Sequence, residues 1–164
     1  MYKNHFFFRT GFGIDIHRLK KGRCLRLGGV DIPHSKAVEA HSDGDVLIHA
    51  ICDALLGAAG LRDIGYHFPD TSKKYKNIDS RILLKEVVSL LKKEKFRIVN
   101  IDSSVCLQKP KISGHIEKMK KVLAGVCGIP VNCISVKATT TEKLGFIGKE
   151  EGIAAFAVVL IVKN

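Results

Sequence analysis

The amino-acid sequence predicts an α+β sandwich, in which one mixed β-sheet carries helices packed on one face. Segments typical of strands and of helices follow one another without a regular β-α alternation, and no internal repeat occurs. No stretch is long or polar enough to act as a linker. The 164 residues suffice for one compact domain with its own core but not for two. We therefore expect a single domain over residues 1–164.

The first half of the chain predicts two strands and one buried helix. The stretch Phe6–His17 is rich in Phe, Ile and Gly and favours a strand, and Leu25–Gly29 favours a short strand that ends in a glycine turn. A polar loop follows. In Asp45–Ala59 apolar residues lie almost all around a helix, which predicts that this helix is buried. Ser42 or Asp43 is the expected cap.

The second half predicts two helices and three strands. After a loop over residues 60–72, Asp79 caps a helix that runs to about Lys95. Pro110 opens another helix, which runs from Lys111 to about Val126. The last expected strand is almost wholly apolar, which predicts a central position in the sheet. The three expected strands are Ile98–Leu107, Cys133–Ala138 and Ile153–Val162.

The chain is strongly basic, with 27 Lys and Arg against 16 Asp and Glu, a net charge of +11. This charge favours polyanionic partners, which include nucleic acid, anionic lipid and small phosphorylated substrates. The lysines are spread along the chain, as on solvated helix faces. Aromatic residues make up 7%, and the interleaved basic and aromatic pattern of a single-strand binder is absent from the sequence. We therefore expect no nucleic-acid partner, and a basic nucleic-acid-binding module remains the alternative hypothesis.

The cysteines and the lengths of the apolar segments indicate in which cellular compartment the protein is found. The five cysteines include no C-x-x-C pair, which favours a reducing compartment. The N-terminal run Phe6-Phe7-Phe8 is too short for a signal-peptide core, and no segment approaches the roughly 20 apolar residues of a membrane span. We expect a soluble, cytosolic protein with no membrane partner, although a removed transit peptide would leave no trace.

Two polar features suggest a metal site. Asp15 and His17 stand two apart on an expected strand, so both side chains project from one face. Asp45, His49 and Asp53 form a polar line along the buried helix. Asp15, His17 and His49 together would supply three ligands and leave one tetrahedral position open, as in catalytic zinc sites. On spacing alone, a hydrogen-bonded structural cluster fits equally well.

Two further segments could bind phosphates and sugars. The segment Lys137–Glu142 places three threonines, a carboxylate and a lysine after a strand, which suits phosphate oxygens and a magnesium ion. Threonines are also common in strands for reasons of propensity alone. The loop Asp63–Gly65 and the loop Phe68–Ser72 offer carboxylates and backbone amides for sugar hydroxyls. A solvated turn would have the same composition.

Seven motifs occur in one order from about Gly11 to Ala155, and together they resemble the 2-C-methyl-D-erythritol 2,4-cyclodiphosphate synthases. They cover nearly the whole chain. The motifs are G-x-D-x-H (Gly13, Asp15, His17), A-H-S-D-G-D-V (Ala40–Val46), H-A-x-x-D-A-L-L-G-A (His49–Ala58), D-I-G (Asp63–Gly65), F-P-D-T (Phe68–Thr71), D-S-R (Asp79–Arg81) and K-A-T-T-T-E-K-L-G-F (Lys137–Phe146).

The resemblance implies a zinc-dependent enzyme of the non-mevalonate route to isoprenoid precursors. It implies conversion of 4-diphosphocytidyl-2-C-methyl-D-erythritol 2-phosphate to 2-C-methyl-D-erythritol 2,4-cyclodiphosphate, with release of CMP. The 2-phosphate would attack the β-phosphate in one metal-assisted step, without a covalent intermediate. The resemblance further implies a homotrimer of single catalytic domains with active sites between subunits. The compartment would be a bacterial cytoplasm, or a plastid if a transit peptide has been removed.

The resemblance also assigns roles to residues. Asp15, His17 and His49 would hold Zn²⁺, and Glu142 would hold Mg²⁺ or Mn²⁺ on the diphosphate. His41 and Thr140 would stabilise the transition state. The expected substrate-binding residues are Asp15, Ile16, His17, His41, Ser42, Asp63, Ile64, Gly65, Phe68, Pro69, Asp70, Thr71, Ser72, Leu107, Gln108, Lys109, Pro110, Lys111, Ile112, Ser113, Ala138, Thr139, Thr140, Thr141, Glu142, Phe146 and Lys149.

One departure from the family pattern concerns Lys149, which stands where the family usually has Arg. The family position lies near the trimer axis, in a cavity linked to isoprenoid diphosphates. Lysine keeps the charge but loses the bidentate fork of arginine, and Glu150 adds a negative charge. An isoprenoid diphosphate in this cavity is therefore a doubtful partner here. A metal-dependent nucleotide hydrolase, which would make a linear product, is the remaining alternative.

Overall fold

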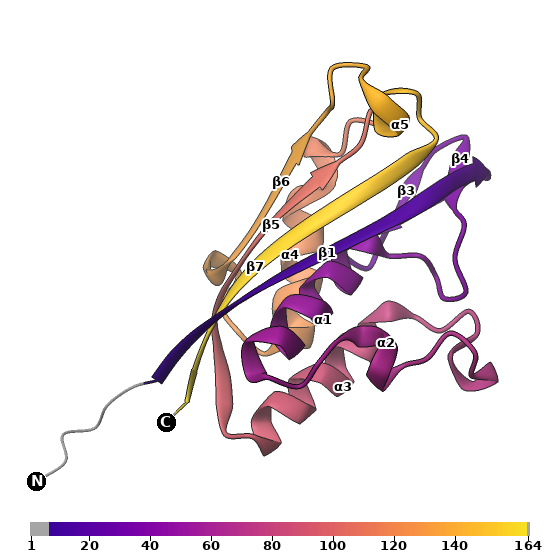
Figure 1. Cartoon of the computed structure of the whole chain (residues 1–164). Helices are drawn as coiled ribbons and strands as arrows, with labels where there is room; N and C mark the ends of the chain where they lie inside the picture. Colours follow the sequence, from indigo (N-terminus) through magenta and orange to yellow (C-terminus); the bar gives the residue numbers. More distant parts are fainter. Residues whose placement is uncertain (1–6, 164) are drawn as a thin grey trace, which may run out of the picture.

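The computed structural model describes residues 7–163 and has the predicted α+β architecture, a mixed sheet with helices on one face (Figure 1). The sheet has five strands in the order β4-β1-β7-β5-β6. These strands are β1 (Phe7–Lys21), β4 (Lys36–Val38), β5 (Phe96–Cys106), β6 (Ile134–Thr139) and β7 (Gly152–Lys163). The helices are α1 (Val46–Ala59), α2 (Ile64–His67), α3 (Ser80–Lys93), α4 (Ile116–Cys127) and α5 (Gly145–Gly148), with 3₁₀ turns η1 (Lys73–Tyr75), η2 (Ser113–His115) and η3 (Val131–Cys133).

The central position expected for the last strand is confirmed. β7 pairs antiparallel with β1 along nearly its whole length, from Phe7↔Lys163 to Arg18↔Gly152, and antiparallel with β5 on its other edge. β5 and β6 run parallel, which makes the sheet mixed. β7 is hydrogen-bonded to a neighbouring strand on both edges and is therefore an inner strand of the sheet, which explains why nearly all its residues are apolar.

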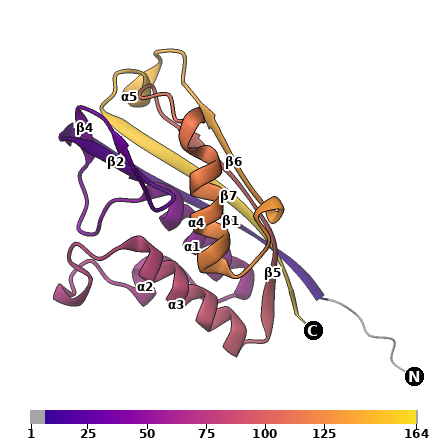
Figure 2. The same ribbon diagram turned by 180° about the vertical axis from the view of Figure 1, so that it is seen from behind.

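The long helices α1, α3 and α4 cover one face of the sheet, as the view from behind shows (Figure 2). α1 is the innermost, and twelve of its fourteen residues are buried. It lies very close to β1, because Gly11 and Gly13 present no side chain there. A Cβ atom added at Gly11 would lie 1.9 Å from the carbonyl oxygen of Ala54, and one at Gly13 would lie 2.0 Å from that of Ala50. These two glycines allow the backbone of α1 to pack directly against β1.

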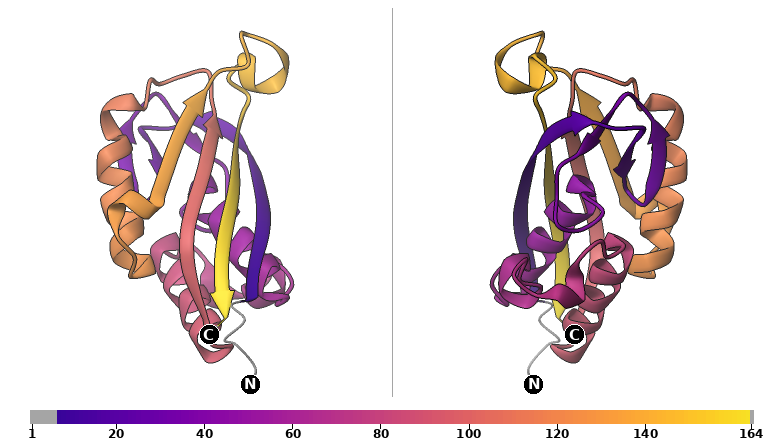
Figure 3. Two further views of the ribbon diagram at one scale, coloured as in Figure 1. Left: turned by 90° about the vertical axis from the view of Figure 1, so that its left-hand side faces the viewer. Right: turned by 90° about the vertical axis from the view of Figure 1, so that its right-hand side faces the viewer.

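Within residues 7–163, no helix lies on the opposite face of the sheet (Figure 3, left). Large apolar side chains of β1 and β7 are exposed there, since alternate residues of a strand point to opposite faces. Phe12 is 61% exposed, and its ring stacks on Phe156 of β7 at a centroid distance of 6.5 Å. The other exposed apolar residues of this set are Phe8, Ile14, Ile16 and Val158. No helix within residues 7–163 has the length and hydrophobicity needed to cross a membrane.

Several expectations about the elements were wrong. The polar loop expected after the second strand contains two short strands, β3 (Val30–Pro33) and β4. β3 forms a hairpin with β2 (Cys24–Leu27). Buried Val30 and Ile32 alternate with exposed neighbours, but four residues are too few for a visible period. α2 lies inside the expected loop 60–72.

The helix expected from Lys111 begins instead at Ile116. Ile112 is 1% exposed because the chain turns it into the core before the helix starts, and η2 intervenes. The cap of α1 is Asp45 rather than Ser42 or Asp43. Asp79 caps α3 as expected. β1 continues to Lys21, beyond the expected end at His17, and the expected first residue, Phe6, lies outside the described residues.

Candidate metal centre and substrate site

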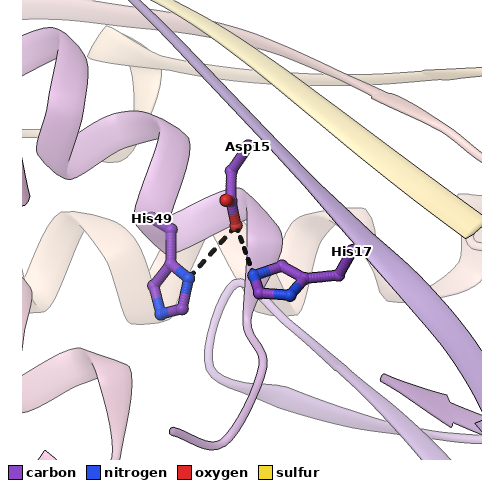
Figure 4. Close-up of side chains that lie close together, drawn as sticks. All are labelled: Asp15, His17 and His49. Carbon is purple, nitrogen blue, oxygen red and sulfur yellow. Dashed lines mark hydrogen bonds and ion pairs between the residues drawn. The ribbon is translucent and has the colours of Figure 1, made fainter. Parts of the chain in front are cut away.

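Asp15, His17 and His49 meet between β1 and α1 (Figure 4). One ligand atom from each of the three lies within 4.8 Å of the others. Oδ2 of Asp15 is 3.0 Å from Nε2 of His17 and 3.1 Å from Nδ1 of His49. Asp15 and His17 lie on the same face of β1, and the close packing of α1 on that face places His49 opposite them. The three side chains form a cluster that could hold a metal ion.

The electrostatics of the cluster favour a cation. Burial by itself would raise the pKa of the Asp15 carboxyl, but hydrogen bonds with His17 and His49 outweigh burial and lower this pKa to about 2. The same hydrogen bond with Asp15 raises the pKa of His17 above its ordinary value. Asp15 is therefore an ionised, partly buried carboxylate flanked by two imidazole nitrogens. One carboxylate and two imidazoles are a donor set that suits zinc and other divalent transition metals.

The second nitrogen of each imidazole has its own partner. Nδ1 of His17 lies 3.3 Å from the backbone carbonyl oxygen of Glu39. A carbonyl only accepts hydrogen bonds, so Nδ1 of His17 is the donor to Glu39. A metal ion that replaced the Nε2 proton shared with Asp15 would therefore meet the Nε2 lone pair. Nε2 of His49 lies 2.9 Å from Oγ of Ser80 and 3.3 Å from Oγ of Ser42. Sequence reasoning assigned no role to Ser80, although it noted the D-S-R motif that contains it.

The other two carboxylates of the polar stripe on α1 have structural partners. Asp45 is fully buried, and it accepts hydrogen bonds from the backbone N–H groups of Gly28, Gly29 and Ile48. Burial raises the pKa of Asp45. Asp53 accepts from the N–H of Ile64 at 2.7 Å, and burial raises its pKa as well. Asp45 thus ties the β2–β3 turn to α1, and Asp53 ties α2 to α1.

A cavity of about 490 Å³ opens beside the cluster. Eleven of the predicted site residues line it, which brings the metal cluster together with residues of both predicted sugar-binding segments. Asp63 and Ser72 are not among the lining residues; Asp63 caps α2 through the N–H of Tyr66. Sequence reasoning missed Ala40, Tyr75, Ile78 and Leu83. The predicted residues that line this cavity are Asp15, His17, His41, Ser42, His49, Ile64, Gly65, Phe68, Pro69, Asp70 and Thr71, of which His49 was predicted as a metal ligand only.

A second cavity of about 390 Å³ gathers the predicted cytosine-binding residues with Thr140 and Glu142. Glu142 accepts a hydrogen bond from Oγ1 of Thr140 at 2.9 Å, and its backbone has φ 51°. Different residues line the two cavities, so within one chain Glu142 and the metal cluster do not share a cavity. The lining residues are Leu107, Gln108, Pro110, Lys111, Ile112, Ser113, Ala138, Thr139, Thr140 and Glu142.

The remaining predicted residues lie elsewhere. Ile16 and Phe146 line a third cavity, of about 680 Å³, which also includes His17 and Glu150. Lys109 pairs with Glu150 at 3.4 Å. Thr141 donates to the carbonyl oxygen of Leu144 at 2.7 Å. Lys149 is exposed, and within the described part of the chain it lines none of these three cavities.

Comparison with known proteins assigns the chain to a family. A model of the YgbB family matches residues 8–162, nearly the full length. The chain belongs to the YgbB family. A protein of Bacteroides thetaiotaomicron named 2-C-methyl-D-erythritol 2,4-cyclodiphosphate synthase is 58% identical over 156 residues, which are 95% of this chain and 98% of that protein. The YgbB-family match and this relative together confirm the family expected from the sequence motifs.

Solved structures share the fold. The structure named IspF from Plasmodium falciparum, in complex with CDP, has a TM-score of 0.84 and 40% identity, and the match covers 96% of this chain and 97% of that one. The bifunctional IspDF from Campylobacter jejuni has a TM-score of 0.94 and 44% identity. That match covers 98% of this chain and 43% of the other. The YgbB-family fold of this chain therefore corresponds to one part of the longer protein.

Proposed function

We propose that this chain converts 4-diphosphocytidyl-2-C-methyl-D-erythritol 2-phosphate to 2-C-methyl-D-erythritol 2,4-cyclodiphosphate and CMP, a step of non-mevalonate isoprenoid precursor synthesis. The observation that carries the proposal is the cluster of Asp15, His17 and His49 beside a cavity of about 490 Å³. The 58% identical relative bears the name of this synthase, and the IspF structure was solved with CDP, which contains the cytidine diphosphate unit of the substrate.

The metal assignments belong to this proposal. Zn²⁺ would be held by Asp15, His17 and His49, with one position left open for a phosphate oxygen. Glu142 would hold Mg²⁺ or Mn²⁺ on the diphosphate. Bound divalent cations supply positive charge that neutralises phosphate oxygens and favours in-line displacement. The chain's own contribution is to fix the three ligands from β1 and α1 at one point, next to the cavity where a phosphorylated sugar fits.

The chemistry requires positioning rather than proton transfer. The attacking 2-phosphate oxygen is already ionised, and CMP leaves as an anion, so no general base is needed. The difficulty is to bring two polyanionic groups together, which favours charge neutralisation and orientation as the main catalytic effects. We assign His41 and Thr140 to the stabilisation of the pentacoordinate transition state. The five cysteines have no role in this reaction.

Substrate contacts divide between the two cavities. The segments Asp63–Gly65 and Phe68–Ser72 would contact the ribose and the methylerythritol. Leu107–Ser113 with Ala138 and Thr139 would bind the cytosine. Because the two cavities have different linings in one chain, a complete site requires the second cavity of a neighbouring subunit. This arrangement, and the apolar sheet face without a helix, support a homotrimer with its active sites between subunits. We propose a cytoplasmic location for the enzyme.

The proposal is tested by incubating the purified protein with the cytidyl substrate, Zn²⁺ and Mg²⁺, and following the ³¹P NMR signals. We expect CMP to appear together with the signals of a cyclic diphosphate, and we expect neither product after removal of metal with EDTA. CMP accompanied by a linear phosphate would instead identify a nucleotide hydrolase and refute the cyclisation.

A further inference from the structure

A serine hydroxyl lies directly behind the metal cluster. Ser80, the first residue of α3, is 0% exposed, and its Oγ is 2.9 Å from Nε2 of His49. The same Oγ is hydrogen-bonded to Oδ1 of Asp43. Ser80 therefore connects a metal-cluster imidazole, which comes from α1, with a carboxylate in the loop before α1. Residues 31 positions apart in the chain make the His49–Ser80 contact.

Asp43 acts only as an acceptor in this arrangement. Its Oδ2 accepts from Nε of Arg26 at 3.1 Å and from the backbone N–H of Ser80 at 3.0 Å. Its Oδ1 accepts from the N–H of Asp45 at 3.3 Å. Arg26, from β2, is itself held by Asp31 at 2.8 Å and by Asp79 at 3.1 Å. Both carboxylate oxygens of Asp43 therefore face N–H groups, which donate hydrogen bonds and cannot accept them.

The direction of each proton follows from these contacts. Ser80 has one hydroxyl proton, and Asp43 has none to give, so Ser80 must donate to Asp43. The Ser80 oxygen then faces Nε2 of His49 with a lone pair, and this contact is a hydrogen bond only if Nε2 carries the proton. A neutral imidazole with a protonated Nε2 has its lone pair on Nδ1. Nδ1 lies 3.1 Å from Oδ2 of Asp15, so a bound metal would take the place of the Nδ1 proton that otherwise donates to this carboxylate.

We propose that Ser80 is a positioning residue of the metal centre, which fixes the ring orientation and tautomer of His49 so that the Nδ1 lone pair points at the metal. Asp43, held by Arg26, is the group that sets the direction of the Ser80 hydroxyl. This inference rests on the proposed zinc site. Partners of this kind orient metal-binding histidines in many metalloproteins, and their loss commonly weakens metal binding 10- to 100-fold. Ser42 is a weaker candidate, since its Oγ is 3.3 Å from Nε2 and accepts from the N–H of Gly44.

The first test measures zinc affinity by competition with a chromophoric chelator. Ser80→Ala should bind Zn²⁺ about 10-fold or more weakly than the unmodified protein. Ser103→Ala is the matched control, because Ser103 is also a buried serine, 2% exposed, but donates to the carbonyl oxygen of Ser135 on β6. It should keep the unmodified zinc affinity. Equal affinity in Ser80→Ala and the unmodified protein would overturn the inference, whereas an unmodified protein that takes up no zinc would refute the proposed metal site itself.

An isosteric variant tests the direction of the hydrogen bonds. In Asp43→Asn, Oδ2 faces two N–H groups at 3.0 and 3.1 Å, which cannot accept, whereas Oδ1 faces one N–H at 3.3 Å and the reversible hydroxyl of Ser80. The amide oxygen should therefore stay at the Oδ2 position, and the amide NH₂ should face Oγ of Ser80. Ser80 would then accept from residue 43 and turn its proton toward His49 Nε2, which disfavours the metal-binding tautomer. We expect a loss of zinc affinity of about 10-fold or more although Ser80 is present, with unchanged far-ultraviolet circular dichroism as the folding control. Unchanged affinity would contradict the assigned directions.

The tautomer itself can be observed. In the zinc-loaded unmodified protein, ¹H–¹⁵N NMR of the imidazoles should show His49 with a protonated Nε2 and a metal-bound Nδ1. Zinc on Nδ1 fixes this tautomer by itself, so the readout specific to Ser80 is the Nε2 proton, which should exchange with water faster in Ser80→Ala because its acceptor at 2.9 Å is gone. A metal-bound Nε2 in His49 would refute the proposal.

Discussion

At the scale of single residues, three aspartates near α1 have three different environments. Asp15 faces two imidazole nitrogens, Asp45 faces three backbone N–H groups, and Asp53 faces one. The partners, rather than burial alone, distinguish them: burial raises the pKa of all three and hydrogen bonds lower it, but only for Asp15 do the hydrogen bonds outweigh burial. Asp15 is thus the carboxylate suited to a cation.

Zinc uptake should follow this distinction. His49→Ala and Asp15→Ala should each abolish stoichiometric zinc binding at micromolar metal, because two ligands do not make a stable site. Asp53→Asn is the control on the same helix: its amide oxygen can still accept from the N–H of Ile64, so zinc should be retained. The measurement is zinc content by atomic absorption after gel filtration. Full occupancy in either alanine variant would contradict the ligand assignment.

The sequence predicted much of this site but not its supporting shell. The D-x-H pair and the polar stripe on α1 were both visible, but spacing alone fitted a structural cluster equally well, and the resemblance to the synthases was needed to select His49 as the third ligand. The stripe could not show which of its members faces β1, because i, i+4 and i+8 positions share one face of a helix whatever packs there. Ser80 and Arg26 come from distant segments, and only the tertiary structure brings them to His49 and Asp43.

At the scale of elements, the contact of β1 with α1 sets the distance between the metal ligands. Two ligands stand on the strand and one on the helix, so any increase in the strand–helix separation moves His49 away from Asp15 and His17. Gly11 and Gly13 allow the short separation, since a Cβ at either would lie within 2.0 Å of a helix carbonyl oxygen. The backbone packing of this pair is therefore part of the metal site.

Gly13→Ala should damage both stability and metal binding. The added methyl has no room beside Ala50, and overpacking of this kind typically costs about 1–3 kcal/mol. We expect a lower free energy of unfolding in urea, and zinc affinity reduced by about tenfold or more because α1 is displaced.

Gly57→Ala is the matched control for this variant, since no atom lies within 4 Å of a Cβ added at this position of α1. Alanine in a helix should raise stability by about 0.5–1 kcal/mol. A Gly13→Ala protein with unchanged stability and zinc affinity would show that the strand–helix contact does not set the ligand geometry.

Helices and strands with a clear hydrophobic pattern could be predicted from the sequence, whereas the shortest strands could not. The buried helix, the helix capped by Asp79 and the apolar last strand were all placed within a few residues. β3 and β4 have four and three residues, too few for alternation to be recognised, and only pairing with β2 and β1 defines them. The start of α4 was misplaced because Pro110 is a frequent first residue of helices, while burial of Ile112 decides the local path here.

At the scale of the whole molecule, one face of the sheet has large exposed apolar side chains, and no helix or strand of the described part of the chain covers it. Exposed apolar patches of this kind mark interaction sites in soluble proteins. The proposed trimer would bury Phe12, Ile14, Ile16 and Val158, whose exposed fractions range from 44% to 61%. Sequence periodicity could not identify this face, because it does not show on which side of a sheet the helices pack.

Phe12→Glu should dissociate the trimer, because the apolar face would then carry a charge that assembly must desolvate. Multi-angle light scattering should give a mass near the 18.0 kDa of one chain, against three times that mass for the unmodified protein. Ile82→Glu, at a 49% exposed apolar position on α3, is the control and should stay trimeric. An unmodified protein that is monomeric at micromolar concentration would refute the proposed assembly.

The pairing of the first described strand with the last has a consequence for chain connectivity. Phe7 and Lys163 are register partners, so their Cα atoms lie about 5 Å apart and the two strands end side by side (Figure 1). A linker of a few residues could join them, and new ends could be opened at the exposed turn Glu94–Lys95 between α3 and β5. Such a circular permutant would keep every strand pair and every residue of the metal cluster, so the fold depends on which strands are neighbours rather than on where the chain begins.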